Sequence, residues 1–203
     1  MANLKLHRVA IGDLEDVELE ISPGEIACLS GPSGSGKSRL LRAVADLERH
    51  RGTVALGDRR QQDTPAHQWR REIMMIPAES AWWFDTVGEH FAQPMPQALA
   101  AVGIPEDAAS WPVTRLSSGE KQRLALVRAL SFAPRVLLLD EPTANLDRES
   151  TAQVEDWLRH YIREQKCPVL WVAHHEDQIA RVANRHLRID GKRLLEDDAE
   201  TAP

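Results

Sequence analysis

Eight consecutive residues near the N-terminus have the pattern of a phosphate-binding loop. Residues 31–38 match G-x-x-x-x-G-K-[ST] at every fixed position; they are Gly31, Pro32, Ser33, Gly34, Ser35, Gly36, Lys37 and Ser38. The glycines let the backbone curl so that successive N–H groups point inward and make a nest for anionic oxygens. Lys37 would place a positive charge between the terminal phosphates, and the Ser38 hydroxyl would bind Mg²⁺. Arg39 follows directly and completes the set predicted to hold a nucleotide here.

The residues on either side support this interpretation. The apolar run 25–30 predicts a buried strand before the loop, and 39–45 predicts a helix after it. The N-terminal end of that helix would attract phosphate through its dipole. A Gly/Ser turn that happens to contain a lysine is the alternative, and it does not account for the strand and the helix.

Two neighbouring acids follow another apolar run. Residues 136–139 predict a fully buried strand, and Asp140 and Glu141 come directly after it. Strand ends of this kind lie at the edge of a parallel sheet where ligands bind, so both acids should lie beside the phosphate loop. Asp140 would hold Mg²⁺, and Glu141 would polarise a water aimed at the γ-phosphate. A solvated acidic turn is the alternative, but it explains one such acid better than a pair.

A second anion site is predicted at residues 116–123. Ser117 and Glu120 form an S-x-x-E capping box, so a helix should begin here with free N–H groups pointing outward. Ser118 lies between them, and Gly119 would let a ligand approach closely. An ordinary well-capped helix is the alternative interpretation of this segment.

The elements that must position these residues alternate along the chain. Strands are expected at 4–9, 17–21, 53–56, 73–76, 169–172 and 186–190, and helices at 65–71, 117–132, 148–165 and 176–183. Prolines allow only short helices between 86 and 110. Alternating strands and helices with buried apolar strands predict an α/β core with a mainly parallel sheet. The acidic tail 196–203 is predicted to be disordered.

Composition limits the classes of function. The chain has 203 residues and a net charge of −6, without a basic patch, so nucleic acid is not expected as a partner. Cys28 and Cys167 lie in apolar runs and are interpreted as buried free thiols of a reducing compartment. Neither a signal peptide nor an apolar run of membrane-spanning length is visible, so any membrane span is expected from another chain.

Taken together, these motifs resemble the ATP-binding cassette (ABC) ATPase family over about residues 4–195. Six ordered elements carry the resemblance: the loop 31–38, the segment 116–120, Asp140 with Glu141, Pro142 with Thr143, the loop 144–147, and His174 after the strand 169–172. The resemblance implies a P-loop NTPase core, an N-terminal antiparallel β subdomain and a helical subdomain at about 79–132, all within one domain spanning 1–195.

Function and partners follow from the same resemblance. It implies a Mg²⁺-dependent ATPase that forms a head-to-tail homodimer around two ATP molecules, with Ser117, Ser118, Gly119 and Glu120 of one subunit completing the site of the other. Lys37, Glu141 and His174 would be catalytic, with His174 contacting the γ-phosphate, and Asp147 would communicate across the dimer. The dimer would drive a separate transmembrane permease from the cytoplasmic face of the cell membrane. Residues 161–165 and 169–174 are most similar to the small bacterial iron-exporter class.

The sequence departs from the family pattern in three places. Ala78 stands where the family has a glutamine near the metal. Either Glu79 takes its place after a small loop shift, or Asp140, Ser38 and waters suffice with slower or differently coupled turnover, which is the interpretation favoured here. Residues 4–14 lack the aromatic ring on which the family stacks adenine, which leaves His7 or Ile11 as weaker platforms. The interval from Ala78 to Ser117 is 117 − 78 = 39 positions, which predicts a shortened helical subdomain and a small docking surface.

Three adjacent aromatic residues follow the altered segment. Trp82, Trp83 and Phe84 would either anchor a protein partner or cover the core of the shortened subdomain, and the sequence does not separate the two. Two other functions also stay open: a soluble ABC-type switch, and a weakly catalytic nucleotide-binding regulator without a transport role.

Overall fold

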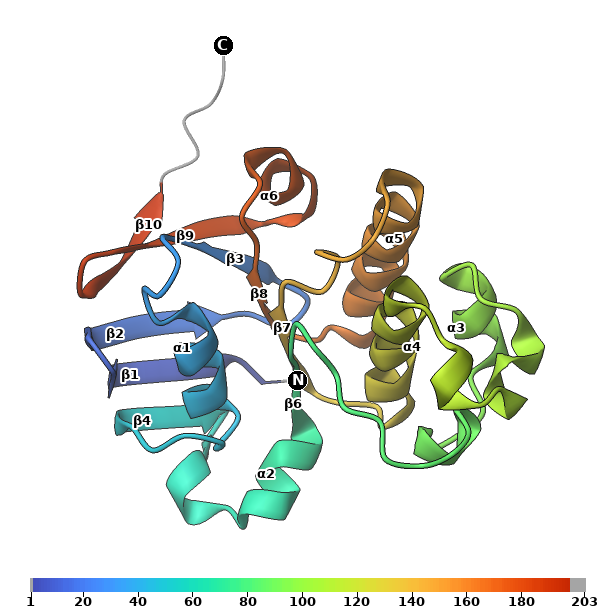
Figure 1. The fold of residues 1–203 in the computed structure, drawn as a ribbon. Coiled ribbons are helices and arrows are strands. Elements are labelled where there is room, and N and C mark those ends of the chain that lie inside the picture. The colour runs from blue at the N-terminus through green and yellow to red at the C-terminus, as the bar shows by residue number, and fades with distance from the viewer. Residues whose placement is uncertain (1, 198–203) are drawn as a thin grey trace.

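Two β-sheets with helices around them make up residues 2–197, the part of the chain that the computed structural model describes (Figure 1). The smaller sheet is antiparallel and joins, in spatial order, β2 (Leu14–Ile21), β1 (Leu4–Ile11), β4 (Arg51–Leu56) and β5 (Arg59–Arg60). Buried and exposed residues largely alternate along β1 and β2, so one face of this sheet packs on the core and the other meets solvent. The predicted N-terminal antiparallel unit is therefore present.

The larger sheet has the order β10-β9-β3-β8-β7-β6 and is parallel except for the hairpin of its last two strands. Its strands are β3 (Ile26–Ser30), β6 (Ile73–Ile76), β7 (Val136–Asp140), β8 (Val169–Val172), β9 (Arg185–Asp190) and β10 (Arg193–Asp197). β7 and β8 are buried throughout, as expected of parallel strands covered on both faces. The carboxyl ends of β3, β6, β7 and β8 meet at one edge, because these strands run in the same direction.

Helices cover both faces of the larger sheet. α1 (Lys37–Val44) lies between the two sheets and shares one apolar cluster with them (Figure 1). A second cluster on the other face contains residues of α3 (Pro96–Ala101), α4 (Ser118–Ser131), α5 (Arg148–Gln165) and α6 (Glu176–Val182). α2 (Ala66–Glu72) leads into β6, and short 3₁₀ turns occupy Gln61–Asp63, Gly88–His90, Glu106–Ser110 and Val113–Arg115. The fold is thus the predicted α/β core with a mainly parallel sheet.

Few helical residues lie between β6 and α4. Within residues 79–117 the structure has only α3 and three 3₁₀ turns. Pro96 begins α3, and Pro105 and Pro112 immediately precede the two later turns. Proline lacks the N–H that a continuing helix needs, so these residues keep each helical piece short.

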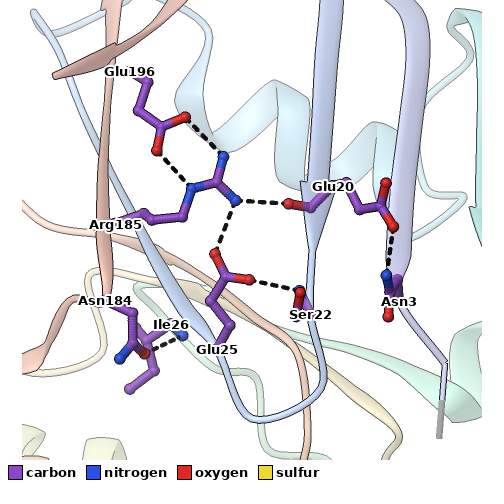
Figure 2. Close-up of polar contacts among 8 residues, drawn as sticks. All are labelled: Asn3, Glu20, Ser22, Glu25, Ile26, Asn184, Arg185 and Glu196. Atoms are coloured by element: carbon purple, nitrogen blue, oxygen red, sulfur yellow. Dashed lines mark hydrogen bonds and ion pairs between the residues drawn. The ribbon is translucent and has the colours of Figure 1, made fainter. Parts of the chain in front are cut away.

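The prediction that the acidic tail is disordered from residue 196 is wrong for its first two residues, because Glu196 and Asp197 belong to a strand. Glu196 belongs to β10, where its carboxylate accepts hydrogen bonds of 2.7 and 2.9 Å from Nε and Nη2 of Arg185 (Figure 2). Arg185 Nη1 also donates to Oε1 of Glu25 at 2.8 Å and to the carbonyl of Glu20 at 2.7 Å. The hydrogen bonds that Arg185 donates to Glu196 lower the pKa of the Glu196 carboxyl. Arg185 therefore stabilises Glu196 in the sheet, and the local sequence around residue 196 does not reveal this partner. Residues 198–203 of the predicted tail lie outside the described residues.

The two cysteines are expected to be protected from thiol reagents. Cys28 and Cys167 are 0% and 1% exposed, and burial raises the pKa of each thiol to about 12. The reactive thiolate is therefore scarce at pH 8. We expect no reaction with Ellman's reagent in the folded protein and two thiols per chain in denaturant, measured by absorbance. Rapid labelling of either cysteine under native conditions would contradict this prediction.

Candidate nucleotide site

The phosphate loop connects β3 to α1 and has the backbone that its glycines permit. Gly31, Gly34 and Gly36 have φ angles of 146°, 77° and 101°, all in the region that glycine favours. Gly36 is also the N-cap of α1, and a Cβ there would lie 3.3 Å from Cδ1 of Leu14. The Ser35 hydroxyl is buried and has no hydrogen-bond partner within residues 2–197. A phosphate oxygen in this loop would satisfy that hydroxyl.

The side chain of Lys37 binds to the backbone of its own loop. Its side chain is almost fully enclosed, and Nζ donates hydrogen bonds to the carbonyls of Gly31 at 2.8 Å and Pro32 at 2.9 Å. Burial lowers the pKa of this lysine, while the nearby charges of Glu141 and Asp140 oppose the shift. The structure therefore brings the predicted lysine and the predicted acidic pair into one electrostatic environment.

The acidic pair lies at the carboxyl end of β7. Asp140 ends the strand and is buried, whereas Glu141 follows it with a φ of 50°, a conformation uncommon outside glycine. Nε2 of His174 lies 2.7 Å from Oε1 of Glu141. An ionised carboxylate only accepts hydrogen bonds, so the ring N–H must be the donor. Glu141 and His174, 33 positions apart in the chain, therefore meet at the edge of the sheet that carries the phosphate loop.

Ser38 and Asp140 are the predicted ligands of Mg²⁺. Both offer oxygen ligands, and the Asp140 carboxylate is buried at the end of its strand. Mg²⁺ usually takes only one or two protein ligands and completes its coordination with water and phosphate oxygens. The described residues contain no group of three His, Cys, Asp or Glu side chains that could hold a metal.

The predicted capping box is present at the start of α4. Ser117 Oγ accepts from the Glu120 N–H at 3.2 Å, and Glu120 Oε2 accepts from the Ser117 N–H at 2.8 Å. A Cβ on Gly119 would lie 3.5 Å from Leu146 and 3.7 Å from the carbonyl of Asn145. Within residues 2–197 no hydrogen bond joins segment 116–120 to the phosphate loop. The structure thus places Gly119 beside the loop 144–147 of its own chain, and it shows no hydrogen bond from this segment to Lys37 within residues 2–197.

Asp147 caps the helix that follows this loop. Its carboxylate accepts from the N–H of Ser150 at 2.9 Å and from Oγ of Ser150 at 2.8 Å, which lowers the pKa of the carboxyl. These bonds fix the start of α5 and with it the loop 144–147 beside Gly119.

The structure places the residues named where the sequence departs from the family pattern. Ile76 pairs with Leu139 across the sheet, so Ala78 follows β6 at the same edge as Glu141, and the Glu79 side chain beside it is exposed. Ile11 is buried in the core, so the expectation that it could carry adenine is wrong. His7 lies 3.0 Å from Oε1 of Glu18, on the exposed face of the smaller sheet.

A buried polar network lies beside the site and was not predicted from the sequence. Glu155 of α5 is 3% exposed and accepts hydrogen bonds from Arg181 and Gln178 of α6. Gln178 also donates to Oγ1 of Thr143 at 2.7 Å. Three members of the network, Thr143, Gln178 and Arg181, line a cavity of about 370 Å³ together with Glu141 and His174. Glu155 shares the helical spacing of the buried Leu158 and Ile162, and an acid on that apolar face was the available signal.

The three aromatic residues that follow Ala78 differ in their burial. Trp82 is partly buried and packs against the core cluster, whereas the side chains of Trp83 and Phe84 are 64% and 48% exposed. His90 holds the segment, because its Nε2 accepts the N–H groups of Trp83 and Phe84 at 2.9 and 3.0 Å. Arg128 of α4 lies 4.6 Å from the ring centre of Trp82.

Comparisons with known proteins agree with this geometry. The family model described as ABC transporter matches residues 14–144. The chain is 39% identical to an aliphatic sulfonates import ATP-binding protein of Rhodococcus jostii, over 90% of this chain and 69% of that protein. It is 33% identical to the "Probable iron export ATP-binding protein" of Escherichia coli, over 82% and 80%, and 34% identical to an L-cystine transport system ATP-binding protein of the same organism, over 93% and 85%.

A solved structure supports the fold. A bacterial Atm1-family ABC exporter with ATP bound matches 96% of this chain with a TM-score of 0.85 at 24% identity, and this chain spans 38% of the exporter's length. No helix within residues 2–197 is long and apolar enough to cross a membrane. The names of the relatives include both import and export systems, so the iron-exporter class expected from the sequence stays a prediction.

Proposed function

This chain belongs to the ABC transporter family as an ATP-binding ATPase, and we propose that it works as a Mg²⁺-dependent dimer that drives a separate membrane permease. ATP binding would close two copies head to tail around two nucleotides, and hydrolysis would reopen them. The transported substrate would be chosen by the permease, because the site described above binds only the nucleotide.

The contact between His174 and Glu141 carries the catalytic part of the proposal. Glu141 follows the last residue of β7, beside the phosphate loop, and its carboxylate can orient a water toward the terminal phosphate. The N–H of His174 holds that carboxylate now and could turn to the γ-phosphate when nucleotide is present. Lys37 would exchange its two loop carbonyls for phosphate oxygens and so stabilise charge on the transferred group. Mg²⁺, held by Ser38 and Asp140, would neutralise phosphate charge.

The separation of the two anion sites within one chain supports a dimer. The capped N-terminus of α4 makes no hydrogen bond to the phosphate loop of its own chain, yet its free N–H groups suit an anion. A head-to-tail arrangement would place Ser117, Ser118, Gly119 and Glu120 of one subunit against the nucleotide bound by the other. Asp147 would then lie near the dimer contact, because the loop that it ends already touches Gly119.

The exposed pair Trp83 and Phe84 offers a docking point for the permease. Aromatic side chains dominate the binding energy of protein interfaces, and these two project from a segment anchored by Trp82 and His90. The segment leaves the same sheet edge as the catalytic residues, a few positions after Ala78. A partner seated on it at the cytoplasmic face of the membrane would sense changes around the nucleotide.

The proposal is tested by measuring ATPase activity with and without Mg²⁺, and with and without each membrane protein that is found to be encoded beside this chain, reconstituted in lipid. We expect hydrolysis that requires Mg²⁺ and changes rate when the permease is added. Unchanged rates with every neighbouring membrane protein would favour a soluble switch. Nucleotide binding without hydrolysis under all conditions would favour a regulator.

Replacing Trp83 and Phe84 together with Ala should weaken capture of the permease by at least about thirtyfold, because truncating a single hot-spot aromatic residue costs about 2 kcal/mol. Binding would be measured by pull-down from detergent at several protein concentrations. Leu47→Ala is the matched control, since Leu47 is 55% exposed elsewhere on the surface. Equal capture of the double variant and the control would exclude this docking point.

A further inference from the structure

The side chain of Arg39 is held in a fixed plane at the start of α1. Its Nε and Nη2 lie 2.8 and 2.7 Å from Oε1 of Glu48, a residue that follows α1. Two nitrogens on one carboxylate oxygen restrict rotation of the guanidinium. Half of the Arg39 side chain nevertheless remains exposed. Its orientation is therefore set by the protein while part of its surface stays open.

Gly12, in the turn between β1 and β2, leaves room for this guanidinium. A Cβ built on Gly12 would lie 3.0 Å from Cζ and 3.6 Å from Nε of Arg39, and nearer still to Nη1. The glycine therefore lies over the guanidinium rather than beyond its tip, and any larger residue would displace the arginine. The same turn continues to Leu14, which packs against Gly36 of the phosphate loop. Arg39, Gly12 and the loop thus form one continuous wall.

The nucleoside end of a bound nucleotide should reach this wall. In a loop of this pattern the lysine reaches the β- and γ-phosphates, while backbone N–H groups hold the α- and β-phosphates. With the terminal phosphates at Lys37 and the metal at Ser38, the α-phosphate lies toward the first turn of α1, and the sugar and base continue beyond it. Arg39 is the residue after Ser38, and residues 2–14 contain no Phe, Trp or Tyr that could stack on the base in its place.

We propose that Arg39, positioned by Glu48 against Gly12, stacks its guanidinium on the nucleobase. This assignment rests on the proposed function, because it assumes that the phosphate loop holds a nucleotide. A planar delocalised cation can stack on any base, since every base has a π-face. Selection between bases needs hydrogen bonds to their edges, which stacking does not supply. The expected consequence is similar affinity for ATP and GTP.

The test compares binding of ATP, GTP and inorganic triphosphate by calorimetry, using the full chain. Arg39→Ala should weaken ATP and GTP by about tenfold, in the range of a stacked cation, and leave triphosphate within about twofold. Arg39→Lys should behave like Arg39→Ala, because it keeps the charge and loses the plane. Glu48→Gln should give a smaller loss for the two nucleotides only. Arg42→Ala, which removes another exposed arginine of α1, should bind all three ligands like the wild type.

Two results would overturn the assignment. Unchanged ATP affinity of Arg39→Ala would remove Arg39 from the site. Equal weakening of all three ligands, restored by Arg39→Lys, would make it a phosphate-binding charge instead. Failure of the wild type to hydrolyse ATP counts against the proposed function alone, because the role of Arg39 is decided by binding.

Discussion

Replacing Glu141 with Gln should lower the rate of ATP hydrolysis by about 10²- to 10⁴-fold, the usual contribution of a positioned general base. The amide keeps the size of the carboxylate and can still accept the N–H of His174, now 2.7 Å from Oε1. ATP affinity should therefore stay within a few-fold of the wild type. Because binding continues without turnover, the variant should accumulate as an ATP-bound dimer, visible by light scattering after size-exclusion chromatography.

The matched control for this prediction is Glu164→Gln. Glu164 lies on the surface of α5 and pairs with His160 at 3.1 Å, far along the helix from its cap at Asp147. This variant should hydrolyse ATP at the wild-type rate and return to a monomer as nucleotide is consumed. Near-normal turnover by Glu141→Gln would show that another group activates the water.

The fold follows from the sequence wherever one segment carries its own pattern. The strand Val169–Val172 and the helix Arg148–Gln165 have their predicted bounds, because an unbroken apolar run and an amphipathic period need no knowledge of distant residues. β10 was not predicted, since its acids look solvated until Arg185 is placed beside them. The two-residue strand β5 carries no periodic signal at all.

The candidate site could be predicted where a motif consists of consecutive residues, but not where distant residues meet. Motif spacing identifies the phosphate loop and the acidic pair, since that chemistry depends on consecutive residues. The hydrogen bond between Glu141 and His174 depends on β7 and β8 being neighbours, which spacing alone does not give. The sequence does not predict the hydrogen bond between Glu155 and Gln178, because these residues lie 23 positions apart on different helices. The orientation of Arg39 likewise depends on a glycine and an acid from two separate turns.

Replacing Lys37 with Ala should reduce ATP affinity by at least about 100-fold. A charge-assisted hydrogen bond contributes about 1.5–3 kcal/mol, and the two that Lys37 can give to phosphate correspond to two or more powers of ten. The loss is also structural, because the variant leaves the carbonyls of Gly31 and Pro32 without their donor and the loop without its internal brace. Calorimetric titration with ATP measures the effect.

Lys192→Ala separates this effect from a general loss of charge. Lys192 is exposed, and its ammonium pairs with Glu15 at 2.9 Å on the surface, so its removal should leave ATP affinity unchanged. Protection of the two buried cysteines from Ellman's reagent would verify that both variants are folded. ATP binding by folded Lys37→Ala at wild-type strength would mean that the backbone nest alone holds the phosphates. The ammonium would then be a brace for the loop, and phosphate recognition would belong to the N–H groups that the glycines turn inward.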